Sequence, residues 1–566
     1  MSAATRSLEA GGSLLEHKKA RQACIEHRGH VSAATRSLEA GGSLLEHKKA
    51  RQACIEHRGH VSEATRSLEA GSSFLAHKNR ADPLCFFVSQ KLDKFHYARR
   101  LKYDTMHVTK GGIHMKAIIL AAGKGARMQS DMQKVMHPML GKPVLQYVVE
   151  AARGAGFDDI TVVVGKDGAE IERELGSKFD GLYFAVQEKP LGTGHAVLAG
   201  AGRVAPTDDV LILCGDMPLV TSEFIDDLMK FKRDNFSDAV VAAVYRDDLG
   251  DFGRVYDDNS YFIEIVEARD IKNHARTNWA NTGIYMFKGR SLLRALGMMK
   301  NNNSQGEYYL TDVPKIISED GKNVQVFHTR TSMSVFAGIN TQEHLAEALA
   351  HMRVRVNSRH MANGVRMIDP TTTYIDDGIK IGRGVVIYPN VIIEGACEIA
   401  PGATIGMGCH LTDTTVGEGV HIRQTVANGA KIGANSDVGP FACLRPGAVI
   451  GQNCRVGNFV EIKNANLADG VKAAHLAYIG DADVGKNVNF SCGAITANYD
   501  GEKKHRTTIG DNAFIGSNVN LIAPIEIGAD AVIAAGSTIT DKIPPCALGI
   551  ARERQCVKLD YKNASQ

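Results

Sequence analysis

The chain has 566 residues, 44% of them hydrophobic, which is enough for about three or four domains with large cores. Its net charge of +3 is unevenly spread, because the first 114 residues carry 19 Lys+Arg against 11 Asp+Glu and the rest carries 47 against 52. The mildly acidic body gives no nucleic-acid footprint, and no apolar run reaches the ~18 residues of a membrane helix or forms the core of a signal peptide. The 11 cysteines include no Cys-x-x-Cys pair, so we expect reduced thiols in the cytoplasm.

The first 114 residues are predicted to be a non-functional extension, poorly ordered or loosely helical, with Met115 as the suspected true start. Residues 2–30 recur without change as residues 32–60, and the copies are too short and polar to bury a core. Cys24 and His27 form a repeated Cys-x-x-His pair, for which a metal site is the alternative interpretation. We do not expect one, because no full ligand set follows at zinc-finger spacing.

A strand over residues 116–120 runs into a glycine-rich turn with Gly123 and Gly125. A strand, a glycine turn and then a helix form the arrangement whose backbone amides bind phosphate. The dinucleotide fingerprint fails, because Met128 occupies the third glycine position, and the turn is not a Walker A loop. A plain turn is the alternative, but Arg127 and Lys134 follow closely and are placed to meet phosphate oxygens.

Strands over 160–164, 183–186 and 210–213 alternate with helices, as in a doubly wound α/β domain. After the second of these strands, Gln187 is suited to read the edge of a base, and the glycines behind it let the backbone approach a flat ligand. Asp216 follows the third strand, where α/β domains bind ligands, although a helix cap is an equally good interpretation of this residue.

The second half of the chain repeats aliphatic residues every six positions, in three runs over 381–411, 432–462 and 509–539. A helix or an ordinary sheet has another period, so the spacing predicts a coil of short parallel strands; a Gly-rich sandwich with accidental spacing is the alternative. A helix over 341–361 is expected to connect the two halves. The period breaks over 463–478, around His475, and over 497–508, where a polar loop must leave the coil.

These motifs together resemble one enzyme family. The glycine-rich loop, Gln187, Gly192-Thr193-Gly194-His195 and Gly215-Asp216 look like a sugar-1-phosphate nucleotidyltransferase domain, and residues 278–284, 305–312 and 338–340 extend the resemblance. With the period-six region, the chain from Met115 to about Arg552 resembles the bifunctional bacterial enzymes that make UDP-N-acetylglucosamine, a precursor for peptidoglycan and lipopolysaccharide.

The resemblance implies a Rossmann-like α/β domain with a mostly parallel sheet, followed by a left-handed parallel β-helix of hexapeptide repeats that assembles as a homotrimer. The implied domains are the extension at 1–114, a uridyltransferase domain at 115–342, a helical linker at 343–363, an acetyltransferase domain at 364–552 and a tail at 553–566. The implied reactions are acetyl transfer from acetyl-CoA to glucosamine-1-phosphate and then uridyl transfer from UTP to N-acetylglucosamine-1-phosphate, with Mg²⁺ as cofactor. No nucleic-acid partner or membrane insertion is implied.

The family's uridyltransferase residues carry over onto this sequence as follows. Mg²⁺ prefers oxygen ligands and shares substrate phosphates, so two protein oxygens suffice. The resemblance assigns Asp216 and Asn340 to the metal, Arg127 and Lys134 to the triphosphate, Leu120, Ala121, Ala122 and Gly123 to the nucleotide, Gln187, Gly192 and Thr193 to uracil, and Gly253, Glu267 and Asn281 to the sugar. Cys214 stands where the family commonly has Tyr.

The resemblance also assigns the acetyltransferase site. His475 is implied as the general base that takes a proton from the sugar amine, whereas a lone histidine without this context is more often structural. Arg445, Lys463, Tyr478 and Asn489 are implied around the acceptor sugar phosphate, and Cys492, Asn498, Tyr499, Ser517, Ala535 and Arg552 around acetyl-CoA. Cys492 stands where the family often has Ala, so a reactive thiol or a small packed residue are both open there.

Two other functions remain open at the level of sequence. One is a monofunctional nucleotidyltransferase with a structural tail, against which His475, Arg445 and Lys463 argue, because a structural tail has no need of them. The other is a catalytically silent assembly subunit, against which Lys134 and Asp216 argue.

Overall fold

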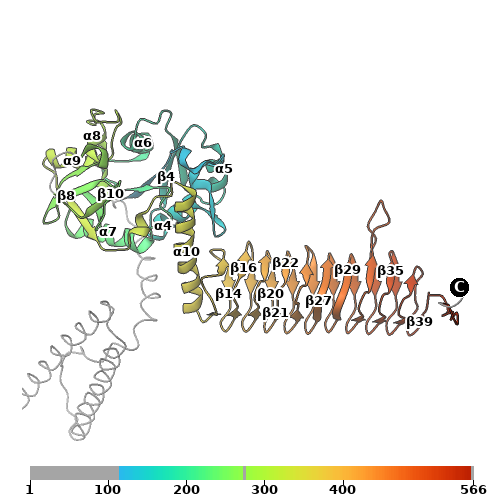
Figure 1. Ribbon diagram of the computed structural model, residues 1–566. Coiled ribbons are helices and arrows are strands. Elements are labelled where there is room, and N and C mark those ends of the chain that lie inside the picture. Colours follow the sequence, from blue (N-terminus) through green and yellow to red (C-terminus); the bar gives the residue numbers. More distant parts are fainter. Residues whose placement is uncertain (1–113, 272–275, 562–566) are drawn as a thin grey trace, which may run out of the picture. The chain divides into compact units, whose positions relative to one another are not determined.

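The structure is a computed structural model that describes residues 114–271 and 276–561 (Figure 1). The described residues all belong to one compact unit. Apart from His114, the repetitive N-terminal extension and its Cys24 and His27 lie outside the described residues, so the predictions made for them stay predictions.

The first part of the described chain is built on a nine-stranded sheet of order β5-β4-β1-β6-β10-β7-β11-β9-β8. The first four strands of this order are parallel, β10 is antiparallel to both of its neighbours in that order, and β7 and β11 are again parallel. The strands are β1 (Met115–Ala121), β4 (Asp159–Val164), β5 (Leu182–Val186), β6 (Asp209–Cys214), β7 (Ala239–Tyr245), β8 (Arg254–Asp258), β9 (Tyr261–Val266), β10 (Trp279–Lys288) and β11 (Val324–Thr329). A separate small hairpin joins β2 (Pro138–Met139) to β3 (Lys142–Pro143).

Helices cover both faces of this sheet, as the alternation of strands and helices predicted. Alternate residues of a strand point to opposite faces, and in β1 the side chains of Ala117 and Ile119 belong to one apolar cluster while Ile118 belongs to the other. The first cluster takes in buried residues of α4 (Val144–Gly154), α5 (Ala169–Gly176) and α7 (Ser222–Asp234), and the second those of α6 (Thr193–Gly200), α8 (Gly289–Leu296) and α9 (Asp312–Glu319).

One local prediction was wrong. The sequence predicted a helix directly after the glycine-rich turn, but the chain forms only a single 3-10 turn there, η1 (Ala126–Met128), and the next α-helix starts at Val144. The physical reason is that both residues flanking the turn, Gly125 with φ 63° and Gln129 with φ 48°, adopt left-handed backbone conformations that end a helix. An anion at this loop would therefore meet loop backbone rather than the N-terminus of an α-helix.

A 21-residue helix, α10 (Gln342–Ala362), connects the two halves, as predicted. The Thr341 side chain caps it by accepting a hydrogen bond from His344 N at 3.2 Å. Its apolar side chains pack into the apolar cluster that continues through the coiled second half: Leu345, Ala348, Leu349, Met352 and Val356. The helix is therefore part of the same core as the coils.

The second half is the predicted left-handed parallel β-helix, from β12 (Arg366–Met367) to β39 (Leu548–Gly549). Ile387, Ile405, Ile422 and Val438 pair in register on successive coils, and each side chain is fully buried. The six-residue period therefore arises because each short strand contributes one inward-pointing aliphatic side chain. Asparagines such as Asn435 (φ 57°) and many of the glycines occupy left-handed corner positions, as expected of residues that tolerate positive φ.

Both breaks in the period have a structural counterpart. Around His475 the chain stays in the coil, but β27 (Arg455–Lys463) and β29 (Lys472–Gly480) run for nine residues each and pair with one another. The second break is a hairpin that leaves the coil between β32 (Ile495–Ala497) and β33 (Thr507–Ile509), closed by an antiparallel bridge between Tyr499 and Lys504 (Figure 1). In the described part of the chain, no helix combines the length and apolar character needed to cross a bilayer.

Candidate active sites

The loops after β1 and β6 meet because these strands are parallel neighbours, with Leu120 opposite Cys214. Gly215 N donates a hydrogen bond to Leu120 O at 2.8 Å. A Cβ at Gly215 would lie 3.0 Å from that oxygen, so the close contact between the two backbone segments favours glycine at this position. The glycine-rich loop and Asp216 therefore lie side by side at the carboxyl end of the sheet, as expected for the ligand site of an α/β domain.

Four of the predicted residues converge at this carboxyl end of the central strands. Lys134 Nζ lies 2.5 Å from Asp216 Oδ2 and 3.2 Å from Asn340 Oδ1, and Arg127 Nη2 donates to the same Asn340 oxygen at 3.1 Å. Ile339 N donates to Asp216 O at 2.9 Å, which brings residues 338–340 against the loop after β6. The helix-cap interpretation of Asp216 does not describe this site, because its carboxylate is paired with a lysine from another loop.

The donor set fits a divalent cation. The Asp216 carboxylate and the Asn340 amide oxygen are hard ligands, and they already point at one positive centre, the Lys134 ammonium. Two protein oxygens that share a cation leave the remaining coordination positions to water and phosphate oxygens, which is the usual way in which proteins hold Mg²⁺.

The predicted base-reading loop has its side chains turned inward. Gln187 is buried, and its Nε2 donates to Gly192 O at 3.1 Å and lies 3.1 Å from His195 Nδ1. Gly192 has φ 109°, and a Cβ there would lie 2.6 Å from Tyr308 O, so this position requires glycine. Thr193 Oγ1 accepts from Leu310 N at 3.1 Å, which ties the loop to the segment before α9.

The three predicted sugar-binding residues lie together on the antiparallel side. A Cβ at Gly253 would lie 3.5 Å from both the Asn281 Cβ and Glu267 Oε2. Burial raises the pKa of Glu267, although Thr311 Oγ1 donates to its carboxylate at 3.0 Å. Thr311 was not predicted as a site residue, because nothing in a lone threonine before a helix distinguishes it in the sequence.

Cys214, which stands where the family commonly has Tyr, is a free and partly buried thiol. Burial raises its pKa to about 12, and the charge of Asp216 adds to the shift. Its Sγ donates to Gly283 O at 3.8 Å.

A second group of predicted residues lies on neighbouring coils of the β-helix. Cys443, Glu461 and Tyr478 pair in register, which aligns the segments that carry Arg445 and Lys463 beside them. Arg445 Nη1 donates to Glu461 Oε1 at 2.8 Å; Glu461 was not predicted as a site residue.

The hairpin at 498–506 brings a further cation to this group. The largest cause that lowers the pKa of Lys463 is a side-chain contact with Lys504. Partial desolvation and the positive charges of Lys504 and Arg445 lower it further. Asn498 Nδ2 donates to Tyr478 Oη at 3.4 Å and to the Asp481 carboxylate. An anionic ligand beside Lys463 would relieve the repulsion that lowers the pKa of this side chain.

His475 lies exposed on β29, opposite Asn458 of the preceding coil. Three residues further along the strand, Tyr478 pairs with Ile495 of the strand that leads into the hairpin. The exposed imidazole is open to a substrate.

The remaining predicted positions follow one edge of successive coils. Asn518 N donates to Cys492 O at 2.8 Å, Gly536 N donates to Ser517 O at 2.7 Å, and a Cβ at Gly536 would lie 4.0 Å from Arg552 Cδ. Cys492 and Ala535 are exposed on this edge, and Asn489 Nδ2 lies 3.3 Å from Ser491 Oγ just before it. The predicted positions therefore lie on consecutive coils.

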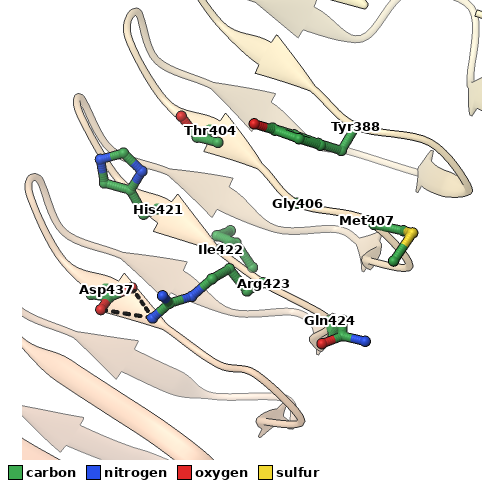
Figure 2. Close-up of a pocket in the computed structure, with 9 residues that line it drawn as sticks. All are labelled: Tyr388, Thr404, Gly406, Met407, His421, Ile422, Arg423, Gln424 and Asp437. Carbon is green, nitrogen blue, oxygen red and sulfur yellow. Dashed lines mark hydrogen bonds and ion pairs between the residues drawn. The ribbon is translucent and has the colours of Figure 1, made fainter. Parts of the chain in front are cut away.

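A groove of about 590 Å³ lies on earlier coils of the β-helix, lined by Tyr388, Thr404, Gly406, Met407, His421, Ile422, Arg423, Gln424 and Asp437 (Figure 2). Arg423 Nη2 donates to both carboxylate oxygens of Asp437, at 2.7 and 2.8 Å, so the groove's main cation is already neutralised. None of the predicted site residues line it. We therefore assign the chemistry to the two residue groups above and not to this groove.

Comparison with known families agrees with both halves. Residues 117–306 match the MobA-like NTP transferase domain, and residues 429–464 and 506–541 match the bacterial transferase hexapeptide (six repeats).

Comparison with whole proteins covers most of the chain. The bifunctional protein GlmU of Acetivibrio thermocellus is 43% identical over 450 residues, which are 79% of this chain and 97% of that protein. The GlmU proteins of Clostridioides difficile and of a Geobacillus species are 41% and 44% identical over 448 residues, again 79% of this chain and 97% of each relative. With both domain types in one chain and relatives matched over nearly their whole length, this protein belongs to the family of bifunctional GlmU proteins and is a bifunctional transferase.

Proposed function

We propose that the chain makes UDP-N-acetylglucosamine in two steps at two separate sites. The β-helix transfers the acetyl group of acetyl-CoA to the amine of glucosamine-1-phosphate. The α/β domain then joins N-acetylglucosamine-1-phosphate to the uridyl group of UTP and releases pyrophosphate. The product would serve the synthesis of peptidoglycan and lipopolysaccharide. We expect both reactions to take place in the cytoplasm.

The observation that supports uridyl transfer most strongly is the convergence of Lys134, Arg127, Asp216 and Asn340 at the carboxyl end of the sheet. In the proposed reaction, a phosphate oxygen of the sugar phosphate attacks the α-phosphorus of UTP in line, and pyrophosphate leaves. Lys134 and Arg127 neutralise charge on the triphosphate, while the glycine-rich loop donates backbone N–H groups to it. No covalent enzyme intermediate is needed, because positioning and charge neutralisation carry such transfers.

Asp216 and Asn340 would hold the Mg²⁺. When bound, the ion supplies Lewis-acid stabilisation of charge on the phosphates. In the proposed complex, Gln187, Gly192 and Thr193 hold uracil, and Gly253, Glu267 and Asn281 hold the sugar.

Acetyl transfer rests on the exposed His475 of β29 and on the cationic group of Arg445, Lys463 and Lys504, which includes a residue of the paired strand β27. The cations bind the sugar phosphate and hold the amine near the imidazole. The amine nitrogen attacks the thioester carbonyl while His475 accepts the amine proton. The C–S bond then breaks, and the leaving sulfur takes up that proton, so that coenzyme A leaves as the thiol. Acetyl-CoA lies along Cys492, Asn498, Tyr499, Ser517, Ala535 and Arg552.

We also propose that the β-helix works as a homotrimer. Phe441, Phe459 and Leu476 are 51%, 60% and 57% exposed on consecutive coils, and the first two rings stack 5.4 Å apart. Such a row of exposed apolar side chains is characteristic of a surface that another chain covers. A closed ring of three β-helices buries the row on every copy.

Two half-reactions test the proposal separately. Wild-type protein with Mg²⁺ should release pyrophosphate from UTP and N-acetylglucosamine-1-phosphate, and should release free thiol from acetyl-CoA and glucosamine-1-phosphate. Asp216→Ala should abolish the first reaction and leave the second unchanged. Asp234→Ala, which removes an exposed carboxylate at the end of α7, is the matched control and should affect neither.

The outcomes separate the alternatives. Pyrophosphate release without thiol release would indicate a monofunctional nucleotidyltransferase with a structural β-helix. Neither product would indicate a silent assembly subunit. Near-full pyrophosphate release by Asp216→Ala would contradict the metal assignment.

A further inference from the structure

The helix α10 contacts both loops of the uridyltransferase site. Near its start, Gln342 Nε2 donates to Met128 O at 3.3 Å, and Met128 closes the glycine-rich loop. Two turns before its end, Arg355 Nη2 donates to Leu219 O at 2.7 Å, and Leu219 lies three residues after Asp216. Asn340 itself lies two residues before the helix. One helix therefore holds hydrogen bonds to the loops that carry both the phosphate-binding residues and the metal ligand.

The loop after β6 is fixed at two points. Ile339 N donates to Asp216 O at 2.9 Å, and Arg355 donates to Leu219 O. The side chains of Leu219 and Ile339 are 3% and 1% exposed and belong to the same apolar cluster as Met352 and Val356 of α10. The backbone of the loop is therefore held at Asp216 and again at Leu219.

Arg355 is suited to this contact. It is half-buried, so burial lowers its pKa, and the charge of Arg359 adds to the shift while Glu223 and Asp377 oppose it. A guanidinium that donates to a carbonyl makes a charge-assisted hydrogen bond, which is shorter and stronger than a neutral one. Its neighbour Arg353 contacts a different element, since its Nη1 donates to Tyr374 Oη at 2.7 Å in the first coil.

We propose that Arg355 is a positioning residue for uridyl transfer, which holds residues 216–219 so that the Asp216 carboxylate meets the divalent cation. This role rests on the proposed function of Asp216. Because α10 is also hydrogen-bonded to the first coil, through Asn357 Nδ2 to Pro370 O at 2.9 Å and to Thr373 O at 3.0 Å, the β-helix supports the uridyltransferase site through the same helix.

The test compares Arg355→Ala, Arg355→Lys and the matched control Arg353→Ala in the full chain. Groups that orient a metal ligand contribute about 10–100-fold to metal affinity or activity, so Arg355→Ala should raise the half-saturating Mg²⁺ concentration for pyrophosphate release by at least about tenfold. Arg355→Lys, which keeps one charged donor, should restore part of the loss, and Arg353→Ala should match wild type. Thiol release at the acetyltransferase site should stay unchanged in all three.

A second readout needs neither metal nor activity. In metal-free protein, backbone amides of residues 215–222 should exchange with deuterium faster in Arg355→Ala than in wild type, while peptides from the β-helix should exchange as before. Unchanged exchange and unchanged Mg²⁺ dependence in both Arg355 variants would overturn the proposal, and so would an equal loss of both activities with a lower melting temperature. If Asp216→Ala were fully active, the proposed function of Asp216 would fail as well, whereas an inactive Asp216→Ala with a normal Arg355→Ala would reject only the role of Arg355.

Discussion

At the scale of single residues, the two chemistries are separated by which side chains carry them. His475 is exposed on a strand of the β-helix, and the Lys134–Asp216 pair lies at the carboxyl end of the sheet in another domain. A change at one residue should therefore affect one reaction only.

Replacing His475 with Ala removes the proposed proton acceptor. General-base catalysis contributes roughly 10²–10⁴-fold, so thiol release from acetyl-CoA should fall by about that factor while acetyl-CoA binding and pyrophosphate release persist. His351→Ala, an exposed histidine on α10, is the control and should retain both activities. A modest loss together with a lower melting temperature would mean that His475 is structural.

The principal site residues could be predicted because they follow strands or glycine turns with recognisable spacing. Asp216 and the glycine-rich loop end neighbouring parallel strands, and this places them together in any α/β domain. Arg355 and Glu461 could not be predicted, since α10 carries several arginines and only packing selects the one that meets Leu219.

At the scale of elements, a charged cluster joins the α/β domain to the first coil. Lys142 Nζ lies 2.7 Å from Asp377 Oδ2 and 2.9 Å from Glu150 Oε2, and Arg359 also pairs with Asp377. Burial alone would raise the pKa of Asp377, but hydrogen bonds from Lys142 and Arg359 outweigh burial and hold it below its usual value of 3.8.

Asp377→Asn should therefore destabilise the protein in a pH-dependent way. A carboxylate whose pKa is lower in the folded state stabilises that state above its unfolded value, near 3.8, and loses this contribution as pH falls through the folded value. Removing one partner from a buried charge cluster should lower the melting temperature by about 5 °C at pH 7. The difference from wild type should shrink below about pH 4. A constant difference across this range in thermal scans would contradict the assigned charge pairing.

The elements themselves were predictable to different degrees. The six-residue period identified the β-helix because each repeat is one strand of a coil with its own buried side chain, such as Ile405 or Ile422. The prediction of a helix after Gly125 was wrong. Gln129 adopts a left-handed backbone conformation although it is not a glycine, and no local sequence pattern indicates this. The antiparallel placement of β10 depends on long-range pairing, which periodicity does not encode.

At the scale of the whole molecule, assembly should depend on the exposed row of Phe441, Phe459 and Leu476. Phe459→Asp places a charge in this row and should convert a trimer into monomers in light scattering, with loss of acetyl transfer and retention of uridyl transfer. Phe236→Asp is the control, since Phe236 is 82% exposed on the α/β domain and should not affect the mass. A wild-type monomer would contradict the proposed trimer.

The repetitive residues 1–114 should be dispensable. The relatives match 79% of this chain while covering 97% of their own length, so about a fifth of this chain has no counterpart in them. A chain that starts at Met115 should keep both activities and its melting temperature. A drop of more than ~5 °C would show that the extension packs on the body.

One coupled assay tests the central claim most directly. Wild-type protein, His475→Ala and Asp216→Ala would each receive UTP, glucosamine-1-phosphate, acetyl-CoA and Mg²⁺, with free thiol and pyrophosphate followed together. Wild type should release thiol first and pyrophosphate after it, and Asp216→Ala should release thiol alone. His475→Ala should release almost no thiol and almost no pyrophosphate. When N-acetylglucosamine-1-phosphate is added, His475→Ala should release pyrophosphate at the wild-type rate. Pyrophosphate release that precedes thiol release in the wild type, or loss of both half-reactions in either variant, would contradict two independent sites acting in this order.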